Sequence, residues 1–246
     1  MNKIVDKDSL EKIAQKYHLN PNIKDKDFDE IFHGLCFDWA EEFIHKDDCI
    51  LEMGYGEGNV CAKLLAKGLD VEIIEGSKSL VLKAQEIFNS QVLVHHALFS
   101  EFFPKKKYDV IFATNILEHV DNPIETLQAI ASWCNKDTKV ILTVPNAESI
   151  HRRLAVLMGI QKELNTLSPR DHVVGHQRVY TYQELIDEVT GQGFQVKKAK
   201  GFLLKVLPNS MMQDFSQDLI SALYAISDQL DITHAADIAL MIQLKQ

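Results

Sequence analysis

The sequence predicts an α/β fold in which a doubly wound, mostly parallel sheet carries helices on both faces. Three observations predict it. Short apolar segments alternate with segments of helical spacing, a glycine-rich turn follows the first apolar segment, and the last two apolar segments suit antiparallel pairing at a sheet edge. Strands buried on both faces read as continuous apolar runs, as these do, and the alternation with helices favours parallel pairing.

The elements follow one another in a regular cycle up to about residue 145. The predicted strands cover residues 49–52, 70–75, 91–95, 108–113, 139–144, 194–202 and 236–244. The predicted helices cover residues 29–45, 59–67, 77–89, 123–134, 147–159, 181–192 and 212–230, with a polar loop over 160–178. Gly68 is expected to cap the second helix at its C-terminus. Thr181 and Glu184 have the spacing of a capping box at the start of a later helix.

The composition excludes several classes of function. Of the 246 residues, 46% are hydrophobic, which is enough for a substantial core. Lys and Arg total 26 against 35 Asp and Glu, a formal charge of −9. An acidic surface repels phosphate backbones, so no nucleic-acid partner is expected. The basic run at 105–107 is interpreted as a solvated loop before a strand.

The cysteines and the apolar runs indicate where the protein works. Cys36, Cys49, Cys61 and Cys134 form no CxxC pair, as expected of reduced, mostly buried thiols. No run approaches the eighteen apolar residues of a membrane span, and the first residues lack the apolar core of a signal peptide. The expected location is the cytoplasm.

The glycine turn after the first strand predicts a ligand site. The segment Gly54-x-Gly56-x-Gly58 lies between a buried strand and a helix, where backbone N–H groups and the helix N-terminus can approach a ligand. A dinucleotide fingerprint would need its third glycine at position 59, which is Asn59. No GK[ST] segment follows, so a P-loop is also excluded.

Two carboxylates refine this prediction. Glu75 ends the second strand, where a carboxylate can accept hydrogen bonds from a ribose diol. Glu52 comes just before the first glycine, in the space that a pyrophosphate would otherwise take. A negative charge there opposes a phosphate and suits a cation such as the α-ammonium group of methionine. The pair favours a nucleoside with an uncharged linker over a dinucleotide.

At these residues the sequence resembles the class I S-adenosylmethionine-dependent methyltransferases, and locally those similar to ubiquinone-biosynthesis and small-molecule O-methyltransferases. The resemblance covers about residues 35–146, and three stretches carry it: LEMGYGEG at 51–58, IIEGS at 73–77 and YDVIFATNILEHV at 108–120. It implies a seven-stranded, Rossmann-like sheet whose last strand is antiparallel, helical and loop additions over the active-site end, and S-adenosyl-L-methionine as the cofactor.

The resemblance also implies roles for individual residues. The methionine part of the cofactor is expected to lie on Glu52, Gly54 and Gly56. The ribose hydroxyls are expected on Glu75, with Gly76 and Ser77 beside the adenosine. The adenine is expected beside His96, Ala97 and Leu98, although family members often have Asp where this chain has His96. Asn115 and Ile116 match positions near the sulfonium.

Three histidines are candidates for a general base that removes the proton of a hydroxyl acceptor. His119 follows the fourth strand, with helix packing as the alternative role. His172 and His176 lie in the predicted loop at 160–178, where Arg178 is a candidate substrate contact. The spacing of the two loop histidines would suit a metal only on a helix, which Val173, Val174 and Gly175 argue against, so no metal is expected. His33, on the first predicted helix, is a candidate for covering the substrate side.

The chain is interpreted as one methyltransferase domain over residues 1–246. It would comprise N-terminal cap helices at 1–46, a cofactor-binding core at 47–146, and substrate-covering additions at 147–180 and 205–232. The leading hypothesis is methylation of a hydroxyl on a small molecule by a monomer or homodimer. The alternatives are methylation of an amine or amino sugar, and a non-catalytic cofactor-binding module that regulates a partner.

Overall fold

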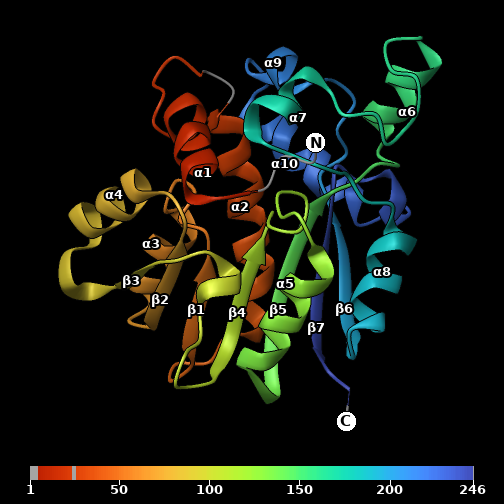
Figure 1. The fold of residues 1–246 in the computed structure, drawn as a ribbon. Coiled ribbons are helices and arrows are strands. Elements are labelled where there is room, and N and C mark those ends of the chain that lie inside the picture. The colour runs from red at the N-terminus through yellow and green to blue at the C-terminus, as the bar shows by residue number, and fades with distance from the viewer. Residues whose placement is uncertain (1–4, 24–25, 246) are drawn as a thin grey trace.

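The computed structural model describes residues 5–23 and 26–245 of the chain. Its centre is a seven-stranded sheet with the order β3-β2-β1-β4-β5-β7-β6 (Figure 1). The strands are β1 (Cys49–Met53), β2 (Asp70–Glu75), β3 (Leu93–His96), β4 (Tyr108–Thr114), β5 (Cys134–Pro145), β6 (Phe194–Phe202) and β7 (Asp237–Leu244). Strands β1 to β5 are parallel, whereas β7 is antiparallel to both of its neighbours. The predicted fold class and the reversed last strand are confirmed.

Helices cover the sheet and its carboxyl end. The α-helices are α1 (Lys7–Ile13), α2 (Lys26–Ala40), α3 (Asn59–Ala66), α4 (Lys78–Phe88), α5 (Pro123–Trp133), α6 (Ile150–Leu157), α7 (Pro169–Val174), α8 (Tyr182–Gly191), α9 (Asn209–Met212) and α10 (Gln217–Ser227). Shorter turns of π- or 3₁₀-helix cover Ala14–His18, Glu41–Phe43, Asn89–Gln91, Phe99–Glu101 and Ile232–His234. In Figure 1, α1, α7 and α9 lie above the carboxyl ends of the parallel strands, as the predicted additions would.

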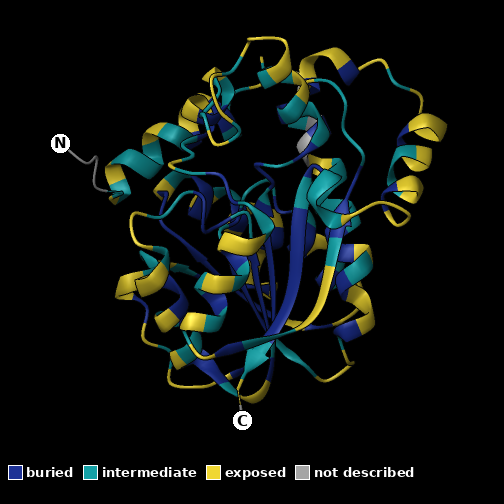
Figure 2. Cartoon of the chain, turned by 90° about the vertical axis from the view of Figure 1, so that its right-hand side faces the viewer, coloured by how far each residue is buried: buried dark blue, intermediate teal, exposed yellow. Residues whose placement is uncertain are grey.

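The sheet is buried on both faces because successive strand residues pack into two different apolar clusters. Ile50 belongs to one cluster and Leu51 to the other, and Ile73 and Ile74 are divided in the same way. Figure 2 shows the strands mostly in the buried colour, with exposed residues on the outer sides of the helices. No helix in the described part of the chain has the length and apolar character needed to cross a bilayer.

The predicted loop at 160–178 contains a helix that was not expected. Helix α7 begins because Ser168 accepts a hydrogen bond from the Asp171 N–H and Pro169 occupies its first turn. It ends at Gly175, whose φ of 90° is left-handed. Val173 and Val174 lie within α7, so the prediction that they argue against a helix is wrong, whereas Gly175 ends the helix before His176.

Other predicted boundaries shift by local capping. The helix expected at 29–45 is α2, which begins earlier and gives way to a 3₁₀ turn at Glu41–Phe43. The helix expected at 212–230 is divided into α9 and α10, since Ser216 caps the second of them through the Leu219 N–H. The capping box of Thr181 with Glu184 is present as predicted.

Candidate active site

One large cavity, of about 1000 Å³, lies at the carboxyl ends of the parallel strands. Ligands of open α/β sheets bind at this end. The glycine turn after β1 and the ends of β2 and β4 form one part of its wall. The N-terminal helices, α5, α6, α7 and the segments at 97–100 and 205–211 form most of the rest. The additions therefore enclose a space that the sheet alone would leave open.

The glycine turn passes this cavity in a backbone conformation that side chains disfavour. Gly54, Gly56 and Gly58 have φ values of 79°, 54° and 82°, all left-handed. A Cβ at Gly58 would also lie 2.7 Å from the ring of Tyr55. The N–H of Gly54 donates to the Ile74 carbonyl at 2.8 Å, which ties the turn to the end of β2. The turn presents bare backbone to the cavity.

Two buried carboxylates lie on the cavity wall beside this turn. Glu75 accepts hydrogen bonds from the N–H groups of Tyr55, at 2.9 Å, and Ser77, at 2.6 Å. Glu52 is only 4% exposed, and its Oε2 has no hydrogen-bond partner among the described residues. Burial, and then the charge of Glu75, raise the pKa of Glu52 well above its ordinary value of 4.5. An unpartnered buried carboxylate of this kind is a place for a cationic ligand group.

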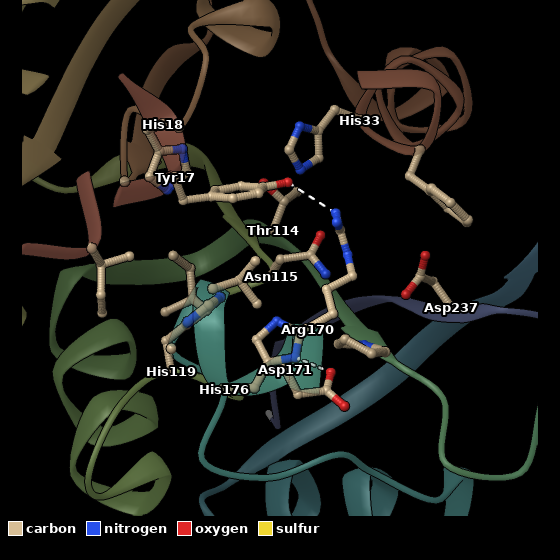
Figure 3. A pocket seen from close by; sticks show the side chains of 18 of the residues that line it. Tyr17, His18, His33, Thr114, Asn115, His119, Arg170, Asp171, His176 and Asp237 are labelled. Carbon is tan, nitrogen blue, oxygen red and sulfur yellow. Dashed lines mark hydrogen bonds and ion pairs between the residues drawn. The ribbon is translucent and has the colours of Figure 1, made fainter. Parts of the chain in front are cut away.

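A second polar group lies on another part of the wall, where two histidines face each other (Figure 3). The ring centroids of His119 and His176 are 4.7 Å apart in an edge-on arrangement. The His176 Nδ1 lies 2.8 Å from Asp171 Oδ1, and Asp171 Oδ2 lies 2.9 Å from an Arg152 nitrogen. Burial, and then the neighbouring His176, lower the pKa of His119 well below its usual range. One part of the cavity wall thus carries two buried carboxylates, and another carries a histidine pair with a carboxylate partner.

The model of a methyltransferase domain family matches residues 28–199 of the chain. The chain belongs to this methyltransferase family. It is 24% identical to the ubiquinone biosynthesis O-methyltransferase of Rickettsia canadensis (strain McKiel) over 83% of this chain and 90% of that protein. It is 30% identical to an uncharacterised methyltransferase of Geobacillus sp. (strain WCH70) over 43% of this chain. This match spans 55%, or about half, of that relative.

The methyltransferase is also similar to a solved structure from Thermotoga maritima. That protein is an S-adenosylmethionine-dependent methyltransferase described as a possible histamine N-methyltransferase. The TM-score is 0.64 at 16% identity, and the match covers 96% of this chain and 100% of the other. The methyltransferase has the fold of that enzyme, whose cofactor is S-adenosylmethionine.

The cavity fits this cofactor at the glycine turn. The unpartnered Oε2 of Glu52 would accept the α-ammonium group, and the turn at Gly54 and Gly56 leaves room for the methionine part. Glu75 is already fixed by two backbone N–H groups and would receive the ribose hydroxyls with its remaining lone pairs. Each of these residues was predicted from the sequence for this purpose, and each lines the cavity.

The residues expected around the adenosine divide into two groups. Gly76, Ser77, Ala97 and Leu98 line the cavity of the methyltransferase. His96 does not line it. It is an exposed residue, and its Nε2 lies 3.1 Å from the Gly76 carbonyl oxygen. His96 therefore supports the backbone of this wall from outside.

The positions expected near the sulfonium, Asn115 and Ile116, both line the cavity of the methyltransferase. Asn115 has a left-handed φ of 53°, and its side-chain oxygen accepts a hydrogen bond from the Thr143 hydroxyl at 3.0 Å. This conformation turns the chain sharply after β4 and leads it to His119.

Of the histidines and the arginine expected on the acceptor side of the methyltransferase, some line the cavity and others do not. His33, His119 and His176 line the cavity. His172 is exposed on α7 and is not part of the wall. Arg178 is also outside the wall: its guanidinium donates to the carbonyl oxygens of Leu117, Val120 and Asp121, at 2.6, 2.5 and 3.2 Å. Arg178 therefore holds the loop that carries His119, which is a structural role.

The N-terminal segment of the methyltransferase makes contacts that the sequence did not reveal. The Glu11 carboxylate receives hydrogen bonds from the Ser77 hydroxyl, at 2.8 Å, and from the Ser79 N–H, at 3.0 Å. Hydrogen bonds from Gln15 and Ser79 lower the pKa of Glu11 to about 2. Helix α1 is thereby fastened across the start of α4, next to the predicted adenosine site.

Several polar residues of the acceptor side were also missed. Tyr17 and Arg170, which line the cavity together, are joined by a hydrogen bond of 2.9 Å (Figure 3). Other polar side chains on this part of the wall are His151, Arg152, Asp171, Lys205, Asn209 and Asp237. Of these residues, only Asp171 has a local sequence signal, since its spacing from Ser168 is that of a capping box.

Replacing Glu52 with glutamine should flatten the pH dependence of stability in the cofactor-free methyltransferase. The Glu52 pKa is raised in the folded state above the value of 4.5 that applies when unfolded. Between these two values the folded chain holds a proton that the unfolded chain has lost, so stability is present below pH 4.5 and falls as pH rises through the folded pKa. Denaturant unfolding of both proteins across this range tests it. Parallel curves for the two proteins would contradict the prediction.

Proposed function

We propose that the enzyme transfers the methyl group of S-adenosylmethionine to a hydroxyl group of a small-molecule acceptor, with a histidine assisting the loss of the hydroxyl proton. The observation that carries the proposal is the shared cavity. Its wall holds the Glu52–Glu75 carboxylates in one part and the His119–His176 pair in another. Its volume of about 1000 Å³ is large for a single small molecule. A cofactor and a small acceptor can therefore lie side by side.

The histidine pair favours a hydroxyl over an amine. A neutral amine has a free lone pair, whereas a hydroxyl must lose a proton during transfer, and a positioned imidazole can assist this. The Rickettsia relative is named as an O-methyltransferase and the Thermotoga structure as a possible N-methyltransferase. The names of the relatives therefore do not decide between oxygen and nitrogen as the acceptor atom, and the proposal depends on the residues of the cavity.

Each group of residues on the cavity wall would have a separate role in the transfer. When bound, S-adenosylmethionine supplies an electrophilic methyl group on its sulfonium. Glu52 and Glu75 would orient the cofactor, and the backbone at Asn115 would border the reacting end. His119 or His176 would lie beside the acceptor oxygen. Since methyl transfer needs an in-line approach, much of the rate enhancement would come from this positioning.

A transfer assay with His176→Ala tests the proposal. We expect the wild-type enzyme to methylate a member of a panel of small hydroxyl compounds. His176→Ala should lower kcat by about 10²–10⁴-fold with little change in cofactor affinity. His172→Ala is the control, since that histidine is exposed on the neighbouring helix outside the cavity and should leave turnover unchanged.

Three results would contradict this proposal. Transfer only to amines would favour the alternative N-methyltransferase. Cofactor binding without transfer to any acceptor would favour a regulatory module. Equal turnover of His176→Ala and the wild-type enzyme would remove the role of that histidine.

We further propose that the 246 residues act as one domain, as a monomer or homodimer, in the cytoplasm. The location is supported by the cysteines, since Cys36, Cys49, Cys61 and Cys134 are all free thiols. The formal charge of −9 supports a small molecule rather than a nucleic acid as the substrate.

A further inference from the structure

The histidine pair belongs to a larger cluster that includes a carboxylate. Potential ligand atoms of Glu118, His119 and His176 lie within 4.8 Å of one another. They come from two separate segments, the turn after β4 and the residues just past α7. We infer that these three residues form a binding site for a first-row divalent cation such as Zn²⁺. This departs from the expectation, drawn from the sequence, that the chain has no metal.

Glu118 supplies the first independent reason. Its side chain is fully buried, and its Oε1 accepts a hydrogen bond from the Asn115 amide at 3.0 Å. Its Oε2 has no hydrogen-bond partner among the described residues. A buried carboxylate oxygen without a partner is costly in a folded protein, and coordination to a cation removes that cost.

The surroundings of His176 supply the second reason. Asp171 Oδ1 lies 2.8 Å from the Nδ1 of His176 and is placed to accept a hydrogen bond from that nitrogen. In that arrangement the Nε2 is the ring nitrogen that could bind a cation. Histidines that bind metals usually donate their other N–H to a carboxylate in this way. Arg152, 2.9 Å from the second Asp171 oxygen, holds the carboxylate in place.

The ligand set indicates the kind of site. Two imidazoles and one carboxylate are the ligands of catalytic zinc sites that keep a further position open. Oxygen-seeking cations such as Mg²⁺ prefer carboxylates and water, so the two imidazoles favour a first-row transition ion or Zn²⁺. His119 and His176 line the cavity, whereas Glu118 is buried and does not. The open position would therefore face the cavity.

A cation in this position would explain how the histidines assist transfer, and this consequence rests on the proposed function. With a cation bound, the imidazoles would act as its ligands and not as bases themselves, and the cation would hold the acceptor oxygen and make its hydroxyl more acidic. The hydroxyl proton would pass to solvent water, the oxygen would bond to the methyl carbon as the carbon–sulfur bond breaks, and the neutral thioether would leave.

Titration with Co²⁺, a coloured stand-in for Zn²⁺, tests the site directly. The full-length protein is first stripped with a chelator, and visible absorption is followed as Co²⁺ is added. We expect one ion per chain, with ligand-field bands of a low-coordinate nitrogen–oxygen site. Glu118→Gln and His176→Ala should each weaken binding by at least about 10-fold, and His172→Ala should leave it unchanged.

The site would be overturned if Co²⁺ gave no saturable 1:1 binding, or if neither substitution weakened it. Circular dichroism of each variant shows whether it is folded. If Glu118→Gln does not fold, His119→Ala replaces it.

The catalytic consequence has a separate readout. Transfer that stops on chelation and returns with Zn²⁺ supports it, and chelator-insensitive transfer contradicts it. Co²⁺ binding without any transfer would contradict the proposed function and leave the cation site standing.

Discussion

Replacing Arg152 with methionine is expected to lower the free energy of unfolding by about 3–5 kcal/mol. The side chains of Arg152 and Asp171 are only 7% and 8% exposed, and their closest atoms are 2.9 Å apart. Arg152 also donates to the carbonyl oxygen of Thr166 at 3.0 Å. Methionine would leave the Asp171 charge buried without its main cationic partner. Denaturant unfolding measures the loss.

The neighbouring arginine provides a matched control for this prediction. Arg153 lies on the same helix, but its side chain is 39% exposed and its ion pair with Glu148 spans 3.6 Å. Exposed pairs contribute little, so Arg153→Met should change the free energy of unfolding by less than about 1 kcal/mol. If Arg152→Met cost no more than Arg153→Met, the buried pair would not be a main support of α6 and α7.

Glu52→Gln is expected to weaken the binding of S-adenosylmethionine by about 100-fold. Glu52 is assigned to the α-ammonium group of the cofactor, and removing one partner of a buried charge pair costs on the order of 2–5 kcal/mol. A 100-fold loss corresponds to about 2.7 kcal/mol. Glutamine keeps the size of the side chain but not its charge. Isothermal titration calorimetry of both proteins measures the difference.

A second buried carboxylate separates this effect from a general disturbance of the sheet. Glu72 lies on β2, is 9% exposed and does not line the cavity. It is paired instead with Lys106 and His95, each at 2.6 Å. Glu72→Gln should leave cofactor affinity within about threefold of the wild-type value, since no cofactor contact is lost. Equal losses in both variants would contradict the assignment of Glu52.

The cofactor side of the site could be predicted because its determinants are local. Gly54, Gly56 and Gly58 lie within one turn, and the left-handed φ values of that turn favour glycine. Glu52 and Glu75 lie at or next to the carboxyl ends of neighbouring parallel strands, so strand pairing brings them together. The antiparallel last strand was also predictable, because the apolar segments at 194–202 and 236–244 suit antiparallel pairing at a sheet edge.

The acceptor side could not be predicted in the same way, because its contacts join distant segments. Arg170 bonds to Tyr17 across 153 residues of sequence, and Glu11 bonds to Ser77 across 66. Neither pair follows from hydrophobic periodicity or turn chemistry. Arg178 shows the opposite error, since a cation in a polar loop suggested a substrate contact and proved to hold backbone carbonyl groups.

Calorimetric titration of the wild-type chain with S-adenosylmethionine, and then with its demethylated product, is the most direct test of the central claim. The glycine turn and the two buried carboxylates predict that both compounds bind with one site per chain, because both carry the α-ammonium group and the ribose diol. No detectable binding of either compound to folded protein would contradict the assignment of the cavity as the cofactor site.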